Sequence, residues 1–129
     1  MKELLFLAGF FTVAGFVCKD SGISYEGAYL GPYKYSASDT LGTIVTTGTI
    51  AIYQKDSQLN GPWRFDDGRS GNLKGTISGA QVYIDLNPQF VDNNLILRGT
   101  LVGNSFSGSW SHFGFPGELA RGSFIATKQ

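Results

Sequence analysis

Few side chains of this 129-residue chain have the chemistry of a catalytic or metal site. His112 is the only histidine, which excludes a conventional multi-histidine zinc site. The simplest interpretation of His112 is a partly exposed loop residue. The alternatives are a residue that contacts a ligand at the mouth of a barrel, or a general base. Ser107-Gly108-Ser109 has no Gly-x-Ser-x-Gly elbow and no paired histidine and acid around it. We therefore expect no catalytic residues and no enzyme.

Clustered aspartate and asparagine side chains occur at two places, and both are typical of turns. Asp66-Asp67-Gly68 and Asp92-Asn93-Asn94 bring together oxygen ligands of the kind that calcium prefers, but neither has the spacing of a calcium loop. The chain has ten basic and ten acidic residues, so it lacks the charge expected for nucleic-acid binding. We expect no metal, no cofactor and no nucleic-acid partner.

The N-terminus has the pattern of an export signal. Lys2 precedes an apolar run from Leu4 to Val17, which ends at Cys18, the only cysteine. Three interpretations stay open: a cleaved signal peptide, a lipoprotein signal with Cys18 as the lipidation candidate, or a short retained membrane anchor. All three predict an exported protein in the periplasm, at the cell surface or secreted. The expected parts are the leader (1–18), a polar tether (19–24) and a β-barrel domain (25–129).

One short phrase, a glycine followed by any residue and then a bulky apolar residue, recurs seven times. Residues two apart share a face of a β-strand, so each phrase places a glycine and a bulky side chain on the same face. The copies are Gly27-Ala28-Tyr29, Gly48-Thr49-Ile50, Gly61-Pro62-Trp63, Gly75-Thr76-Ile77, Gly99-Thr100-Leu101, Gly108-Ser109-Trp110 and Gly122-Ser123-Phe124. The repetition predicts strands built to one plan.

Eight strands are expected after the leader, with residues 31–42 as a long first connection. The expected ranges are 24–30, 43–54, 58–66, 71–78, 81–87, 94–102, 105–111 and 118–127. An open sheet would leave two unpaired edges, and eight is the number of strands at which a small barrel closes around side chains or one small ligand. We predict an all-β fold: an eight-stranded antiparallel up-and-down barrel, in preference to a sandwich.

Turn positions predict the register of each hairpin, because opposed residues in an antiparallel pair have a constant index sum. Turns at Gly103-Asn104 and Gly79-Ala80, with the loop 88–93, predict three of the registers. A turn centred on Gly68 places Trp63 opposite Leu73. Lys74 is expected to face Asp85 across the neighbouring hairpin.

The loop around Phe113 to Gly117 predicts the last hairpin. It places Gly108 opposite Gly122 and therefore predicts a continuous glycine row of Gly99, Gly108 and Gly122. Phe106 is then expected between Leu101 and Phe124. Glycine inside a strand costs stability, so the row implies strand bending, room for large aromatic residues, or room for a ligand.

The predicted inner face is apolar and is the best candidate for a binding site. Its members either fill the barrel or line a cavity beside the glycine row. Expected inward residues are Tyr29, Ile50, Ile52, Trp63, Phe65, Ile77, Val82, Ile84, Leu97, Leu101, Phe106, Trp110 and Phe124. The cavity candidates are Trp63, Phe65, Leu97, Leu101, Phe106, Trp110, Phe124, Gly99, Gly108 and Gly122.

The predicted outer face and one loop are more apolar than an isolated barrel needs. The loop Phe113-Gly114-Phe115-Pro116 is an exposed aromatic candidate for contact with a partner or a membrane. The apolar residues expected to point outward are Tyr53, Tyr83, Ile96, Val102 and Ile125. An interaction subunit that docks on a membrane-associated partner complex is therefore the alternative to a ligand-binding barrel.

Several strand motifs resemble those of bacterial lipocalin-like barrels, which are small secreted proteins or lipoproteins. They are Gly75-Thr-Ile-Ser-Gly, Gly99-Thr-Leu-Val-Gly-Asn-Ser-Phe-Ser-Gly-Ser-Trp and Gly122-Ser-Phe-Ile-Ala-Thr. Avidin-type barrels are similar in the same phrases. The resemblance implies a barrel that binds a small hydrophobic molecule in its interior, without naming the molecule.

Overall fold

The structure, a computed structural model, describes residues 24–90 and 93–129. The leader, the lipidation candidate Cys18 and most of the tether lie outside the described residues. No described segment forms a helix long and apolar enough to cross a membrane.

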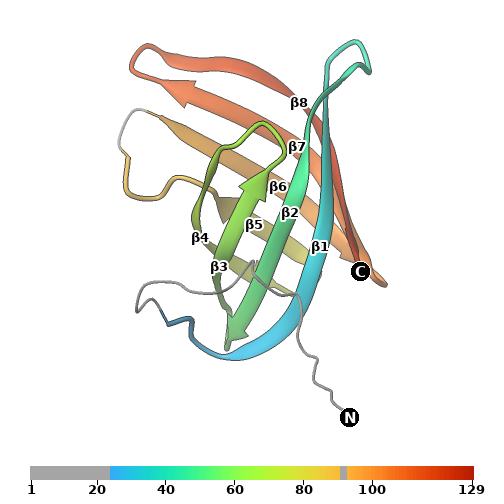
Figure 1. The fold of residues 1–129 in the computed structure, drawn as a ribbon, viewed down its shortest axis with the longest axis vertical. Coiled ribbons are helices and arrows are strands. Elements are labelled where there is room, and N and C mark those ends of the chain that lie inside the picture. The colour runs from blue at the N-terminus through green and yellow to red at the C-terminus, as the bar shows by residue number, and fades with distance from the viewer. Residues whose placement is uncertain (1–23, 91–92) are drawn as a thin grey trace.

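The described chain folds into one closed antiparallel barrel of eight strands, which confirms the predicted architecture (Figure 1). Each strand pairs with its neighbours in sequence, and pairing of the first strand with the last closes the barrel. The strands are β1 (Ala28–Asp39), β2 (Ile44–Lys55), β3 (Gln58–Phe65), β4 (Ser70–Ser78), β5 (Gln81–Asp85), β6 (Asn94–Val102), β7 (Ser105–Gly114) and β8 (Gly117–Lys128).

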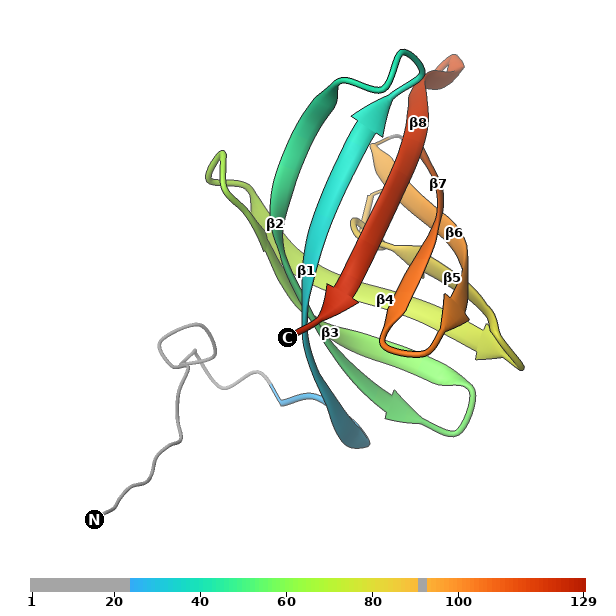
Figure 2. The same cartoon turned by 90° about the vertical axis from the view of Figure 1, so that its right-hand side faces the viewer.

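The two ends of the barrel differ in their connections (Figures 1 and 2). We call the mouth the end at which β1, β3, β5 and β7 finish; it carries the turns at 40–43, 66–69 and 115–116 and the longer β5–β6 connection. The opposite end, here the closed end, carries the tight turns at 56–57, 79–80 and 103–104. The last residues of β8 also lie at the closed end (Figure 2).

The first strand corrects two predictions. Residues 31–39 were expected in a loop because of Pro32 and the serines, but they continue β1 to Asp39. A bulge between Tyr29 and Gly31 shifts the register by one residue and reverses the side on which Tyr29 lies. Tyr29 is therefore 52% exposed and packs on Tyr53 outside the barrel, with ring centroids 4.8 Å apart.

Aromatic rings form a connected series through the barrel interior. Tyr33 meets the edge of Phe106, and Phe106 meets the edge of Phe124, with centroids 5.4 and 5.5 Å apart. Phe124 contacts Tyr35, which stacks on Phe65 at 5.2 Å. The series thus runs from a packed region near the closed end to the mouth.

Three predicted registers are confirmed. Gly99 pairs with Gly108, Ile84 with Leu97, and Lys74 with Asp85. The outward positions are mostly as expected, since Tyr83, Val102 and Ile125 are exposed and Tyr53 is half-buried. Ile96 departs from the prediction, because it is only 5% exposed.

The predicted register of β3 with β4 is wrong by two residues. Gly68 is not at the centre of the turn. The backbone N–H of Phe65 donates a hydrogen bond to the Arg69 carbonyl across the turn, and Gly68 takes the positive-φ position (φ 102°) that follows the turn centre. Trp63 therefore faces Gly71, and Leu73 faces Gly61.

The predicted register of β7 with β8 is also wrong by two residues. The hairpin turns at Phe115-Pro116, and a bulge beyond His112 adds a residue to β8. Gly108 therefore faces Phe124, and Gly122 faces Trp110. The continuous row of three glycines does not form, and Phe106 faces Ala126 on β8, not Phe124.

Candidate functional site

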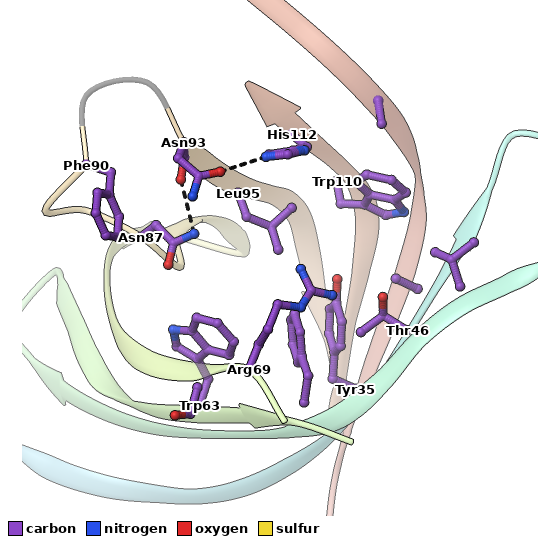
Figure 3. A pocket seen from close by; sticks show the side chains of 15 residues that line it. Tyr35, Thr46, Trp63, Arg69, Asn87, Phe90, Asn93, Leu95, Trp110 and His112 are labelled. Carbon is purple, nitrogen blue, oxygen red and sulfur yellow. Dashed lines mark hydrogen bonds between the residues drawn. The ribbon is translucent and has the colours of Figure 1, made fainter. Parts of the chain in front are cut away.

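A cavity of about 410 Å³ opens at the mouth of the barrel (Figure 3). Its volume lies within the range of about 300–1,000 Å³ that is usual for small-molecule sites. Its wall combines aromatic and aliphatic side chains with a few polar groups. The lining residues are Tyr35, Ala37, Val45, Thr46, Trp63, Phe65, Arg69, Ser70, Asn87, Phe90, Asn93, Leu95, Trp110, His112 and Ala120.

Two tryptophans form opposite parts of the wall, and each is fixed in the same way. The Trp63 indole donates a 2.7 Å hydrogen bond to the Leu86 carbonyl, and the Trp110 indole donates a 2.8 Å bond to the Ser38 carbonyl. Each acceptor lies two strand positions around the barrel from its tryptophan. Since both N–H groups are used by the barrel itself, the rings offer the cavity mainly apolar surface.

A glycine on the intervening strand makes each arrangement possible. A Cβ at Gly71 would lie 3.1 Å from ring atoms of Trp63. A Cβ at Gly122 would lie 1.8 Å from the Ser38 carbonyl oxygen and 2.6 Å from Nε1 of Trp110. Each indole therefore crosses its neighbouring strand where that strand has no side chain, which keeps the ring against the wall.

Tyr35 brings a polar group to the buried part of this cavity. The side chain is 1% exposed, and its hydroxyl lies on the cavity side near Arg69 (Figure 3). Burial raises the pKa of the Tyr35 phenol far above its ordinary value, and the Arg69 charge offsets only part of that rise. The phenol, which is protonated at neutral pH even at its ordinary pKa, is thus a hydrogen-bond donor under all physiological conditions.

Arg69 enters the cavity from the turn between β3 and β4. Its Nε lies 2.9 Å and its Nη2 2.8 Å from Oδ2 of Asp67. Its guanidinium carbon lies 5.0 Å from the centroid of the Phe65 ring. Asp67 is exposed, and its hydrogen bonds from Arg69 hold the pKa of its carboxyl below the usual value. The cation thus already has a carboxylate partner.

Amide side chains organise the mouth on the side of the β5–β6 connection. His112 lies on β7 instead of in a loop, and its Nε2 is 2.8 Å from Oδ1 of Asn93 (Figure 3). Asn87 donates to the Asn93 carbonyl. Asn94 donates to Asp85 and to the carbonyls of Asn87 and Phe90, which holds this connection against the barrel.

The predicted cavity residues separate into two groups. Trp63, Phe65 and Trp110 line the mouth cavity. Leu97, Phe106 and Phe124 are buried in the core, and Leu101 packs against it partly buried. The glycines take other positions: Gly99 is half-buried, Gly108 is exposed, and Gly122 borders a shallow hollow on the other side of Trp110.

Sequence reasoning missed Tyr35 and Arg69. Tyr35 had a detectable signal, because Tyr33, Tyr35 and Ala37 alternate with polar residues as a half-buried strand requires. Arg69 had none, since an arginine after an Asp-Asp-Gly turn is ordinarily solvated. Leu95, which was also missed, is the second residue of β6 and lines the cavity.

Another hollow of about 690 Å³ lies beside β3, β4 and the segment before β1. Its lining includes the polar or charged side chains of Glu26, Asn60, Asn72 and Lys74 beside Leu59 and Leu73. The mouth cavity is the better candidate because its wall is made of strand residues and aromatic rings that are fixed by hydrogen bonds. Within residues 24–90 and 93–129, no group of His, Cys, Asp or Glu side chains is arranged to hold a metal ion.

Comparison with known proteins found no matching family model, no matching curated protein and no matching solved structure.

Proposed function

We propose that this protein is a non-enzymatic barrel that binds a small, mainly apolar molecule in the mouth cavity. The observation that carries the proposal is the pair of tryptophans, each tied by its N–H to a backbone carbonyl and bordering a cavity of about 410 Å³. Transfer of apolar ligand surface from water to these rings provides the binding free energy, about 25 cal/mol per Å².

The structure of the wall supports binding over simple filling. Trp63 and Trp110 are only 4% and 9% exposed, yet the cavity lies beside them. Protein interiors ordinarily leave few voids larger than a water molecule. Rings held against the wall before a ligand arrives also lower the entropy lost on binding.

The cellular location and the structural class of the protein are part of the same proposal. Lys2 and the apolar run that follows support export to the cell envelope or secretion. The closed up-and-down barrel with a cavity at one end supports a lipocalin-like classification, which the strand motifs suggested first.

The neutral fluorescent probe N-phenyl-1-naphthylamine tests the proposal. Its emission is expected to rise on addition of the protein and to saturate. Ala120→Phe fills the cavity from β8 and is expected to abolish the rise. Ser107→Phe, an exposed position on β7 outside the cavity, is the matched control and should retain it. No rise with the unchanged protein, or an equal rise with Ala120→Phe, would contradict the proposal.

Docking of the mouth on a lipid surface is a second candidate, and a specific observation favours it. Leu41 and Phe115 are 89% and 90% exposed, at the tips of the β1–β2 and β7–β8 hairpins. These hairpins are neighbours because β1 pairs with β8 (Figure 2). Six of the ten exposed large apolar residues in the described chain lie at the mouth: Leu41, Ile44, Val45, Phe90, Phe115 and Leu119.

Charges at the mouth suit a lipid surface without net charge. Arg121 lies 3.9 Å from Glu118, and Arg69 is paired with Asp67. Co-sedimentation with phosphatidylcholine vesicles tests this candidate. Leu41→Ser with Phe115→Ser should abolish sedimentation, whereas Val102→Ser with Ile125→Ser, outside the mouth, should not. Failure of the unchanged chain to sediment would exclude it.

A further inference from the structure

We propose that the ligand of the mouth cavity is an uncharged molecule with one hydrogen-bond acceptor, a carbonyl or hydroxyl oxygen, which receives the hydroxyl proton of Tyr35. This inference rests on the proposed function and adds the chemical class of the ligand. It follows from one buried donor and from the charge around it.

The Tyr35 hydroxyl has no hydrogen-bond partner among the residues that the structure describes. Its side chain is 1% exposed and lines the cavity. Buried polar groups are nearly always hydrogen-bonded, and an unsatisfied one costs about 1–3 kcal/mol. The two other buried donors of the wall, the indoles of Trp63 and Trp110, are satisfied by carbonyls. Tyr35 is thus the donor left for a ligand.

The requirement for an acceptor follows from the state of this phenol. Like an ordinary tyrosine, it is a neutral O–H group at neutral pH, and burial raises its pKa further. Its ring is held by stacking on Phe65, at a centroid distance of 5.2 Å and an interplanar angle of 7°, and by contact with Phe124. A held donor in an apolar wall favours a ligand oxygen over a ligand methyl group.

The charges near Tyr35 favour an uncharged ligand. Arg69 is the nearest cation, but two of its nitrogens are engaged by Asp67. The same turn carries Asp66, which accepts a hydrogen bond from Thr47. Two carboxylates and one guanidinium leave the turn without excess positive charge, so an anionic head group would gain little there.

Three small probes of one shape separate the possibilities: acetophenone, α-methylstyrene and benzoate. They present a carbonyl, an equivalent CH₂ group and a carboxylate on the same ring. Binding is followed through the two indole N–H signals in NMR spectra, since Trp63 and Trp110 are the only tryptophans. We expect acetophenone to bind about fivefold more tightly than α-methylstyrene, as one hydrogen bond allows, and benzoate to bind more weakly than either.

Tyr35→Phe is the decisive variant. It should lower acetophenone affinity to that of α-methylstyrene and leave α-methylstyrene affinity unchanged. It should not lower the melting temperature of the free protein, because the hydroxyl has no protein partner to lose. Tyr33→Phe, on the same strand and face but outside the cavity wall, is the matched control and should change neither affinity.

The outcomes distinguish this inference from the proposed function. If acetophenone and α-methylstyrene bind equally and Tyr35→Phe changes neither, the assignment of the acceptor is wrong and apolar binding stands. If benzoate binds most tightly, the ligand is an anion recognised by Arg69. If neither neutral probe moves the indole signals while N-phenyl-1-naphthylamine also fails to bind, the proposed function itself is wrong.

Discussion

The mouth half and the closed half of this barrel use the same strands and the same inward face, but they are filled differently. Toward the middle and the closed end, Ile84, Leu97 and Phe106 are 0%, 0% and 2% exposed and pack together in the core. In the mouth half, equally bulky residues border a cavity of about 410 Å³. Bulk alone therefore does not decide whether a barrel interior is solid or hollow.

The difference lies in how the large side chains are held. Phe106 and Phe124 meet edge to face across the interior, so they occupy its centre. Trp63 and Trp110 each lie over a glycine of the neighbouring strand. Their N–H groups donate hydrogen bonds to backbone carbonyls one strand further on, so the rings lie flat along the wall of the cavity. A glycine opposite a tryptophan thus converts a core residue into a lining residue.

Truncation of a leucine in each half gives the largest expected contrast. Leu97→Ala should lower the free energy of unfolding by about 4 kcal/mol, because it removes a fully buried side chain and leaves a void. Leu95→Ala, which enlarges an existing cavity, should cost only about 1 kcal/mol. Urea denaturation measures both. Equal losses would show that the mouth is packed as tightly as the core.

Alanine at the two glycines beneath the tryptophans should give a smaller contrast. In Gly122→Ala the new Cβ meets the Ser38 backbone carbonyl, so β8 and β1 must separate locally, at a cost of about 3 kcal/mol. In Gly71→Ala it meets only the Trp63 ring, at 3.1 Å, and the cost should be about 1 kcal/mol. Thermal or urea unfolding gives the order. The reverse order would contradict the described fit of the two rings.

The smallest expected effect concerns two aspartates near the mouth. Burial raises the pKa of Asp85, despite hydrogen bonds from Asn87 and Asn94. Hydrogen bonds from Arg69 lower the pKa of Asp67. The contribution of Asp85 to stability is therefore present at low pH and is lost as pH rises through its raised pKa. That of Asp67 is present at higher pH and is lost as pH falls through its lowered pKa.

Carboxyl carbon NMR can assign these two pKa values. Asp85 should titrate above the ordinary aspartate value and Asp67 below it. Asp67 should move toward the ordinary value in Arg69→Gln, whereas Asp85 should not change. Titration of Asp67 at or above the ordinary value would remove the Arg69 pairing on which the argument for an uncharged ligand rests.

The alternation of apolar residues and the repeated glycines predicted the barrel correctly, because strand periodicity and sheet closure are local and topological constraints. Hairpins with two-residue turns were also predicted in register. The β3–β4 and β7–β8 hairpins at the mouth were not, and in the second a bulge beyond His112 adds a residue to β8 without leaving a sequence mark of its own. Gly68 and Phe115-Pro116 each allow more than one turn length.

Those errors concealed the feature that shapes the site. A shift of two residues keeps every side chain on its face but changes its partner, so Trp63 and Trp110 were assigned inward correctly while Gly71 and Gly122 were missed beneath them. Tyr35 was missed because Pro32 indicated a loop. A proline tolerated beside the bulge at Gly31 cannot be distinguished locally from one that ends a strand.

Mapping of N-phenyl-1-naphthylamine by backbone amide chemical shifts tests the central claim most directly. We expect the largest changes at Trp63, Leu95 and Trp110, whereas Leu101 and Phe106 near the closed end should not change. Changes centred on the closed end or on the outer face, or none at saturating probe, would contradict it.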